Sequence, residues 1–355
     1  MTRSTPYLAV DTRVLRRNIA SMAEFAAGAG VALRPHAKTH KSLDVARLQL
    51  EAGAVGLSVA TLGEAEVFAG GGFDDLFIAY PLWVDEAKGR RLRTLVRRAR
   101  VVVGVATESG ARALGSALGD DAGLLGVRIE VDSGHHRSGT VPEEAGRIAA
   151  AASEAGLRID GVFTFPGHGY GPGRALQAAT DEARALGAAA ASLAVAGIEC
   201  RVVSGGSTPT ARRHMPGAVN ELRPGVYVYN DAQQIESGTC TEESVALTVA
   251  ATVVDVRGHL VVVDAGSKVL GADRPDWTTG YGRVAGHPAA RVVALSEHHA
   301  TIDWPATDTA VPPPGAALSL IPNHVCNAVN LVDDVLAVDN GYDAVWAIHA
   351  RGRNS

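Results

Sequence analysis

Eight short apolar runs alternate with helix-like stretches through the first two thirds of this 355-residue sequence. Stretches such as LGEAEVFAG and EEAGRIAAAASEAG are rich in Ala and Glu and favour helices. Runs that are apolar on both faces and separated by helices predict a parallel sheet covered on both sides. Eight such units predict an α/β fold with a closed (β/α)8 barrel of the TIM type, with a doubly wound open sheet as the alternative. The predicted strands end at Ala37, Ala60, Tyr80, Ala106, Val131, Phe165, Gly206 and Asn230.

The character of the sequence changes after about Asp231. Apolar runs such as SVALTVAATVVDV, HLVVVDAG and ARVVALSEH follow one another with turn residues between them and few helical stretches. This pattern predicts an antiparallel β domain. The opening run YLAVD is a further strand that could join the same sheet. We therefore expect a barrel over residues 15–232 and a β-rich domain over residues 233–355 together with residues 1–14.

Composition and charge exclude several classes of function. The net charge is −5 and no basic stripe with interleaved aromatic residues occurs, so nucleic acid is not an expected partner. No apolar stretch reaches the roughly 18 residues that a membrane span needs, and the first residues lack the apolar region of a signal peptide. Three cysteines cannot form a disulfide framework. These features predict a cytoplasmic protein without a membrane partner.

Lys38 lies one residue beyond the first predicted strand, in the segment RPHAKTHKS. Functional side chains of a β/α barrel lie at the carboxyl ends of its strands. A lysine at this position is either a surface residue, which is the usual case, or an amine in the barrel mouth that can form a Schiff base. The neighbouring Arg34, His36 and His40 place more polar groups at the same predicted mouth, which the surface interpretation does not explain.

A glycine pair follows the seventh predicted strand, in the segment VVSGGSTPT. Gly205 and Gly206 let the backbone come close to a ligand, and Ser207 and Thr208 offer hydroxyl groups. A Gly-Gly turn alone is an ordinary loop feature. However, the loops after strands seven and eight of β/α barrels are a frequent phosphate site, so the position of this pair favours phosphate binding.

Two more polar residues follow the fifth and sixth predicted strands. Arg137, in VDSGHHRSG, could donate hydrogen bonds to an anionic cofactor oxygen or belong to an ordinary polar loop. His168, in FPGHGYG, could stack on a ring, relay a proton, or be a plain loop histidine. The residues around each of them leave these interpretations open.

His324 and Cys326, in IPNHVCNAVN, are separated by one residue, so on a strand both would point to the same face. An imidazole and a thiolate suit zinc. Two ligands are too few, so water, another side chain or substrate must complete the coordination. On spacing alone, a chance pair is the competing interpretation.

Taken together, these segments resemble the fold-type III pyridoxal-phosphate family that contains D-serine dehydratase and D-threonine aldolase and whose barrel is like that of alanine racemase. The resemblance spans nearly the whole chain, and its specificity lies in the set and order of the segments. They are RPHAKTHKS, VDSGHHRSG, VVSGGSTPT, NELRPGVYVYND, DAGSKVL, GYGRV, SEHHA and PNHVCNAVN.

The resemblance implies a role for each candidate residue. Lys38 would be the Schiff-base lysine for pyridoxal 5'-phosphate, and Arg137 would hydrogen-bond the phenolic oxygen of the cofactor. His324 and Cys326 would bind a divalent metal, zinc in the dehydratases, which replaces the interpretation as a chance pair. The other candidates for cofactor binding are His168 and Tyr229, with Gly205, Gly206, Ser207 and Thr208 at the phosphate.

The metal pair also bears on the expected reaction. Within the family the dehydratases resemble His-x-Cys and the aldolases His-x-Asp, so His324 and Cys326 favour dehydration. The expected substrate is a 3-hydroxy-D-amino acid, converted as by D-serine dehydratase to a 2-oxo acid and ammonia. Retro-aldol cleavage to glycine and an aldehyde is the alternative. The stretch SEHHA, where the family commonly has two acids, and the loop around His168 depart from the family pattern and bear on the substrate.

Two other interpretations differ in their requirements. An amino-acid racemase needs a second base on the opposite face of the cofactor, and the sequence does not identify one. A non-catalytic cofactor carrier with the same barrel needs neither the metal pair nor residues 235–355. The family resemblance also implies a homodimer.

Overall fold

The structure is a computed structural model that describes residues 3–305, 310–339, 341 and 343–355. The chain divides into two compact units. The barrel unit comprises residues 22–38, 46–225 and 353–355. The β unit comprises residues 1–21, 39–45 and 226–352.

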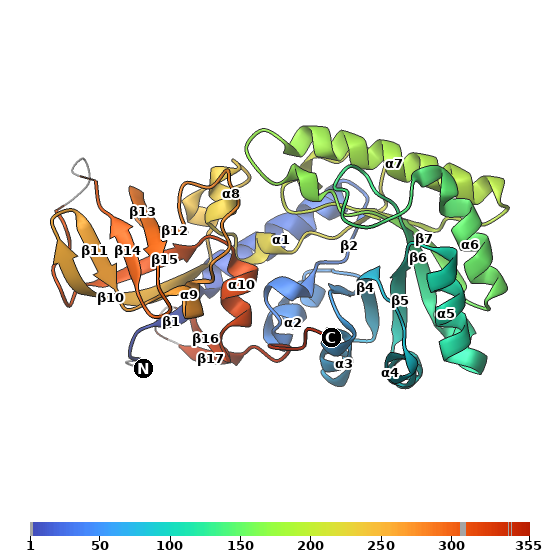
Figure 1. The fold of residues 1–355 in the computed structure, drawn as a ribbon, viewed down its shortest axis with the longest axis horizontal. Coiled ribbons are helices and arrows are strands. Elements are labelled where there is room, and N and C mark those ends of the chain that lie inside the picture. Colours follow the sequence, from blue (N-terminus) through green and yellow to red (C-terminus); the bar gives the residue numbers. More distant parts are fainter. Residues whose placement is uncertain (1–2, 306–309, 340, 342) are drawn as a thin grey trace. The chain divides into compact units, whose positions relative to one another are not determined.

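A ring of eight parallel strands forms the centre of the barrel unit (Figure 1). The strands are hydrogen-bonded in the order β2-β9-β8-β7-β6-β5-β4-β3, and the amide of Ser58 donates to the Pro35 carbonyl at 2.9 Å, which joins the two ends of the sheet. The predicted barrel fold is therefore confirmed. The strands are β2 (Ala32–Leu33), β3 (Leu57–Val59), β4 (Asp75–Pro81), β5 (Arg100–Val105), β6 (Gly126–Glu130), β7 (Arg158–Phe163), β8 (Val202–Gly205) and β9 (Glu221–Leu222).

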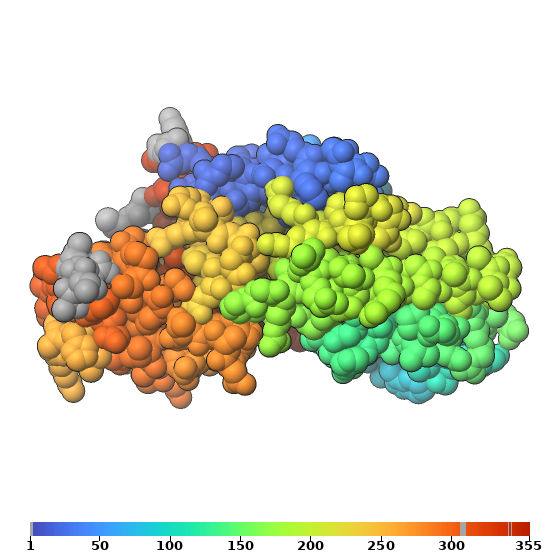
Figure 2. All heavy atoms as spheres, turned by 90° about the horizontal axis from the view of Figure 1, so that it is seen from above, coloured from blue at the N-terminus to red at the C-terminus, as the bar shows by residue number. Residues whose placement is uncertain are grey.

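Helices follow most of the barrel strands and cover the ring from outside. Their sequences carry the expected signals: Thr107 caps α5 by accepting a hydrogen bond from the Gly110 amide at 3.0 Å, and Leu114 and Leu118 are buried against the sheet side. Helices α6 and α7 pack side by side, as the green and yellow-green atoms of Figure 2 show. In the described ranges no helix is both long and apolar enough to cross a bilayer. The helices are α1 (Thr12–Gly28), α2 (Leu43–Glu51), α3 (Leu62–Gly70), α4 (Glu86–Val96), α5 (Glu108–Leu118), α6 (Ala145–Glu154) and α7 (Ala175–Val195).

The β unit is built on a nine-stranded sheet, as the antiparallel patterning predicted. Strand β11 pairs with both β10 and β14, so six strands close into a small antiparallel barrel. The opening strand β1 joins this sheet beside β10, and its pairing with β16 is parallel. The strands are β1 (Tyr7–Asp11), β10 (Leu247–Arg257), β11 (Leu260–Val263), β12 (Gly282–Val284), β13 (His287–Leu295), β14 (Ala300–Asp303), β15 (Ala317–Pro322), β16 (Asp334–Val338) and β17 (Ala344–Ala347). The short helices are α8 (Ala232–Glu236), α9 (Ser267–Leu270) and α10 (Val325–Asn330).

The eighth barrel strand is not the run GVYVYN that the sequence predicted. The strand is Glu221–Leu222, and Val226–Val228 form a turn of 3-10 helix instead. The run alternates apolar and aromatic residues like a strand, but Pro224 precedes it, Gly225 begins it, and Asn230 at its end has a φ of 53°. These residues turn the chain out of the barrel.

The barrel interior contains an apolar layer of Phe77, Val102 and Phe163. The two phenylalanine rings meet edge to face, with their centroids 5.0 Å apart. All three side chains come from the middle or carboxyl half of their strands. They therefore separate the mouth of the barrel from the end at which its strands begin.

Buried charges fill the barrel interior at the end where the strands begin. Glu221 accepts hydrogen bonds from Arg34, with Nε and Oε2 2.8 Å apart, and from Arg128. Arg128 also donates to Asp160 at 2.7 Å, and Arg34 pairs at 2.7 Å with Asp75, the first residue of β4. Arg34 is therefore not at the mouth, as the sequence suggested, because buried carboxylates draw its guanidinium to the opposite end.

The environment of Glu221 sets its charge. Burial alone would raise the pKa of this carboxyl, but the positive charges and hydrogen bonds of Arg128 and Arg34 outweigh burial and lower its pKa to about 2. Glu221 is only 3% exposed, so neither arginine could exchange this partner for water if the carboxylate were lost.

We predict that Glu221→Gln lowers the free energy of unfolding by about 3–5 kcal/mol, because it leaves two buried arginines short of negative charge. Urea unfolding measures the change. Glu199→Gln, which removes an exposed ion pair with Arg201, is the control and should change stability by less than about 1 kcal/mol. Since the folded pKa is depressed from 4.5 to about 2, the contribution of Glu221 is present above pH 4.5 and is lost as the pH falls toward 2. A difference between wild type and variant that stays constant over this range would contradict the assignment.

Candidate functional site

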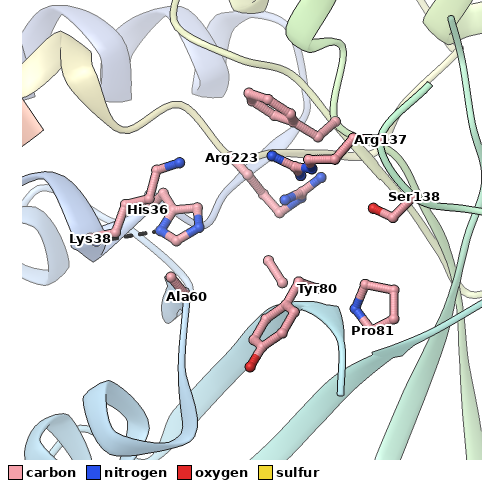
Figure 3. A pocket seen from close by; sticks show the side chains of 10 residues that line it. His36, Lys38, Ala60, Tyr80, Pro81, Arg137, Ser138 and Arg223 are labelled. Carbon is pink, nitrogen blue, oxygen red and sulfur yellow. Dashed lines mark hydrogen bonds between the residues drawn. The ribbon is translucent and has the colours of Figure 1, made fainter. Parts of the chain in front are cut away.

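A cavity of about 460 Å³ opens where the barrel strands end (Figure 3). Its lining residues follow or end β2, β3, β4, β6, β7 and β9, which is the end of a β/α barrel that carries function. Among the described residues that line it, Lys38, Arg137 and Arg223 carry positive charge and none is acidic. The cavity therefore suits an anionic ligand.

Lys38 is half-buried and reaches into this cavity from a short 3-10 turn, Ala37–Thr39. In Figure 3 its amine and the guanidinium groups of Arg137 and Arg223 are turned toward the same space. The Lys38 amine lies 5.6 Å from the centroid of the Phe165 ring, and its backbone amide donates to His36 at 3.4 Å. Lys38 is thus a cavity residue rather than a lysine on the open surface.

Arg137 lies on the loop after β6 and shares Phe165 with Lys38. Its guanidinium carbon is 5.1 Å from the Phe165 ring centroid, within the range of a cation–π contact. The loop is pinned by a bridge between Val131 and Thr140, and the next residue, Ser138, donates to Glu130 at 3.0 Å. The structure therefore brings Lys38 and Arg137 together around one aromatic ring.

Arg223 is a cavity residue that we did not single out from the sequence. It is buried, and its Nε donates to the Ser204 hydroxyl at 2.8 Å while a terminal nitrogen donates to the Thr164 carbonyl. Burial lowers the pKa of Arg223 to about 10, although Glu221 acts to raise it. Its segment, NELRPGVYVYND, was one of those that carried the family resemblance, and that was the available signal.

The glycine loop, Gly205–Thr208, follows β8 as predicted, and it lies next to Arg223, whose amide donates to the Gly205 carbonyl at 2.9 Å. Gly206 has a φ of 81°, and a Cβ there would lie 2.8 Å from the Leu222 side chain. A Cβ on Gly205 would lie 2.4 Å from a carboxylate oxygen of Glu182. Both positions therefore require glycine.

The glycine loop is not among the residues that line the cavity, and neither are two other predicted cofactor residues, His168 and Tyr229. His168 is not among the residues that line the cavity, and its Nε2 is 3.4 Å from a carboxylate oxygen of Asp181 on α7. Tyr229 belongs to the β unit and is fully buried. The Tyr229 hydroxyl has no hydrogen-bond partner in the described chain, and burial together with the charge of Asp44 raises its pKa. The roles of both residues stay predictions.

The predicted metal pair belongs to the β unit and lies at the start of a helix. His324 precedes α10 and Cys326 is in its first turn, so the expectation that the two alternate along a strand was wrong. The strand β15 ends at Pro322, which cannot continue the hydrogen-bonded ladder. The two side chains nevertheless come within hydrogen-bonding reach of each other.

Asp273 is an acidic partner of this pair that the sequence did not reveal. One of its carboxylate oxygens lies 2.8 Å from His324 Nδ1, and the Cys326 thiol contacts the Thr39 hydroxyl at 3.3 Å. Burial opposes a charge on His324, but the Cys326 and Asp273 side chains raise its pKa well above the usual value. Over the described ranges, no group of three or more His, Cys, Asp or Glu is arranged to hold a metal ion.

Two family models match the chain. The alanine racemase N-terminal domain matches residues 10–233, and the model described as "Putative serine dehydratase domain" matches residues 246–338. These matches adjoin each other and together cover most of the barrel and the C-terminal strands.

Characterised relatives cover nearly the whole chain. The D-threo-3-hydroxyaspartate dehydratase of Delftia sp. (strain HT23) is 36% identical over 92% of this chain and 92% of its own length. Its structure superposes with a TM-score of 0.89, 32% identity and coverage of 98% of this chain and 97% of that one, and a mutant of it has been solved in the metal-free form. The 3-hydroxy-D-aspartate aldolase of Paracoccus denitrificans (strain Pd 1222) is 30% identical over 98% of this chain and 92% of its own. The D-threonine aldolase structure from Filomicrobium marinum has a TM-score of 0.87 at 30% identity and covers 98% of this chain and 96% of that one.

We predict that Gly205→Ala destabilises the protein by about 1–3 kcal/mol, because the new methyl group would overlap the buried Glu182 carboxyl. Thermal unfolding measures the loss. Gly187→Ala on α7 is the control: its Cβ would meet nothing within 4 Å, so the change should stabilise the helix by up to about 1 kcal/mol. A Gly205→Ala protein as stable as wild type would contradict the close packing under the loop.

Proposed function

Because the chain belongs to the fold-type III pyridoxal-phosphate family with an alanine racemase N-terminal domain and a serine dehydratase domain, we propose that it dehydrates a 3-hydroxy-D-amino acid. The relatives support the coarser class, a pyridoxal-phosphate lyase that acts on 3-hydroxy-D-amino acids. The observation that carries the proposal is the Lys38 amine in a cationic cavity at the mouth of the barrel. The finer proposal is elimination of the D-serine dehydratase type, which yields a 2-oxo acid and ammonia.

The residues at the cavity fit pyridoxal 5'-phosphate. The cofactor is anionic, and the described lining offers three cationic side chains and no acid. The glycine loop presents backbone without side chains beside Arg223, as close approach of a phosphate requires.

Each of these residues would have its own task. Lys38 would bond to the cofactor aldehyde through Nζ, Arg137 would bind the phenolic oxygen, and the glycine loop would bind the phosphate. The bound cofactor supplies an electron sink for the negative charge that develops at Cα. When substrate is present, the Lys38 amine would take the Cα proton. Phe165, packed against both Lys38 and Arg137, would shield one side of this amine from water.

His324 and Cys326 fit zinc by their donor chemistry. Nδ1 of His324 donates to the Asp273 carboxylate, which leaves Nε2 for a metal and orients the ring. With two protein ligands, the remaining positions would be open to water or substrate, as catalytic zinc sites require. The metal would supply Lewis-acid polarisation of the β-hydroxyl group.

Retro-aldol cleavage is the second candidate function. It is favoured by the 3-hydroxy-D-aspartate aldolase and D-threonine aldolase among the relatives. The thiolate of Cys326 favours dehydration over retro-aldol cleavage. Soft sulfur ligands select zinc, and zinc is the metal that the family resemblance implies for the dehydratases. The homodimer and the cytoplasmic location stay predictions.

We predict that a panel of D-serine, D-threonine and D-threo-3-hydroxyaspartate yields equimolar 2-oxo acid and ammonia, because the β-hydroxyl leaves while the Cα–Cβ bond stays intact. Product analysis by separate assays for keto acid, ammonia, glycine and aldehyde measures the outcome. Chelation should stop turnover and added zinc should restore it. Glycine with an aldehyde would instead identify an aldolase, and a recovered amino acid of inverted configuration would identify a racemase.

We predict that Lys38→Ala abolishes both turnover and the visible absorbance of covalently bound cofactor, because the only proposed attachment atom is Nζ of this residue. The spectrum of purified protein after incubation with pyridoxal 5'-phosphate measures the loss. Lys41→Ala is the matched control, since this lysine of the same segment donates to Asn330 in the β unit at 2.7 Å. The control should keep the absorbance, and an unchanged spectrum for Lys38→Ala would refute the assignment.

A further inference from the structure

We propose that Glu182 is a positioning residue for the cofactor phosphate: it holds the Gly206 amide from behind and so fixes the shape in which the glycine loop receives the phosphate. The inference rests on the proposed function, because it presupposes that this loop binds the phosphate. Glu182 belongs to α7, outside the barrel ring, and none of the tasks given above involves it.

The contact between Glu182 and the loop is direct. Glu182 is 1% exposed, and its Oε1 accepts a hydrogen bond from the Gly206 amide at 2.6 Å. The carboxyl group also occupies the space that a side chain on Gly205 would need, since a Cβ there would lie 2.4 Å from Oε1. One side chain therefore sets both the direction of the Gly206 amide and the depth of the turn.

The loop needs this partner because of its backbone conformation. At a φ of 81°, Gly206 leaves the β8 ladder, so its amide has no strand carbonyl to bind. The next amide, that of Ser207, donates to the Thr210 hydroxyl at 2.9 Å. The hydrogen bonds to Glu182 and Thr210 restrain both amides in the free protein, and such restraint lowers the entropy lost on binding.

Simple core packing does not explain a carboxyl group here. Oε2 of Glu182 is buried and has no hydrogen-bond partner in the described chain, which is unfavourable compared with an apolar side chain of similar size. Leu186, one turn further along α7, shows that a leucine packs under the same glycine. The hydrogen bond to the Gly206 amide, and not the volume of the side chain, therefore explains an acceptor at position 182.

The charge state of Glu182 is compatible with a phosphate nearby. Burial raises the pKa of this carboxyl to about 7, while the Gly206 hydrogen bond and the charge of Arg223 act to lower it. The protonated form keeps a carbonyl oxygen for the Gly206 amide and adds no negative charge beside the phosphate. An amide side chain would provide the same acceptor.

The test compares two ligands that differ only in the phosphate, pyridoxal 5'-phosphate and pyridoxal, by equilibrium dialysis against wild type and three variants. Glu182→Gln keeps an acceptor, Glu182→Met keeps the volume without one, and Leu186→Ala removes packing under the same loop. We expect Glu182→Met to raise the dissociation constant of pyridoxal 5'-phosphate about tenfold or more, as loss of a buried hydrogen bond does. Pyridoxal affinity should stay within about twofold, and Glu182→Gln should bind both ligands like wild type.

The variants also separate positioning from stability. Leu186→Ala should lower the melting temperature, because it opens a cavity in the core, without a selective loss for the phosphorylated ligand. Equal weakening of both ligands by Glu182→Met, no weakening at all, or an equally selective loss in Leu186→Ala would overturn the proposal. If Glu182→Met does not fold, failure of Glu182→Gln to bind like wild type would overturn it as well. Wild-type protein that binds neither ligand would refute the proposed function instead.

Discussion

The ion pairs of Glu221 with Arg34 and Arg128 join the three barrel segments that lead to Lys38, Arg137 and Arg223 in the cavity. Strands β2 and β9 have only two residues each, so their ladder hydrogen bonds hold them weakly. Arg34 comes four residues before Lys38, Glu221 comes two before Arg223, and the strand that contains Arg128 leads into the Arg137 loop. The buried Glu221 carboxylate, held between two arginines, thus anchors the three segments from which Lys38, Arg137 and Arg223 extend to the cavity.

The barrel interior passes from charge to aromatic rings and back to charge. The guanidinium carbon of Arg128 lies 4.4 Å from the Phe77 ring centroid, and that of Arg223 lies 5.5 Å from Phe77 and 5.2 Å from Phe163. Both guanidinium groups thus lie within cation–π range of the Phe77 ring, an attraction that offsets part of the repulsion between Arg128 and Arg223. Arg223 adds its positive charge to those of Arg137 and Lys38, which line the same cavity.

The sequence predicted the parts of this fold that depend on local pattern. Long runs such as RVVVGVA gave strands, and Lys38 and Arg137 were found because a barrel exposes the carboxyl ends of its strands. The sequence did not predict the features that depend on contacts between residues far apart in the chain. A two-residue strand at Glu221 has no detectable period, Arg34 follows its buried carboxylates, and Asp273 lies 51 residues before the histidine it contacts. Glu182 was invisible because one acid in an alanine-rich helix looks like a surface residue.

The two buried glutamates near Arg223 show how environment divides one residue type into two roles. Glu221 has two arginines in contact, so its pKa falls to about 2 and it is a permanent anion. Glu182 has one amide hydrogen bond and a more distant charge, so burial prevails and its pKa rises to about 7. The anion lies inside the barrel and is linked to Arg223 through Ser204, whose hydroxyl donates to Glu221 at 2.7 Å and accepts from Arg223 at 2.8 Å. The group that can become neutral is under the glycine loop. This arrangement would suit the proposed phosphate site, because a fixed negative charge under the loop would oppose the phosphate, whereas the charge of Glu221 is neutralised by the two arginines that contact it.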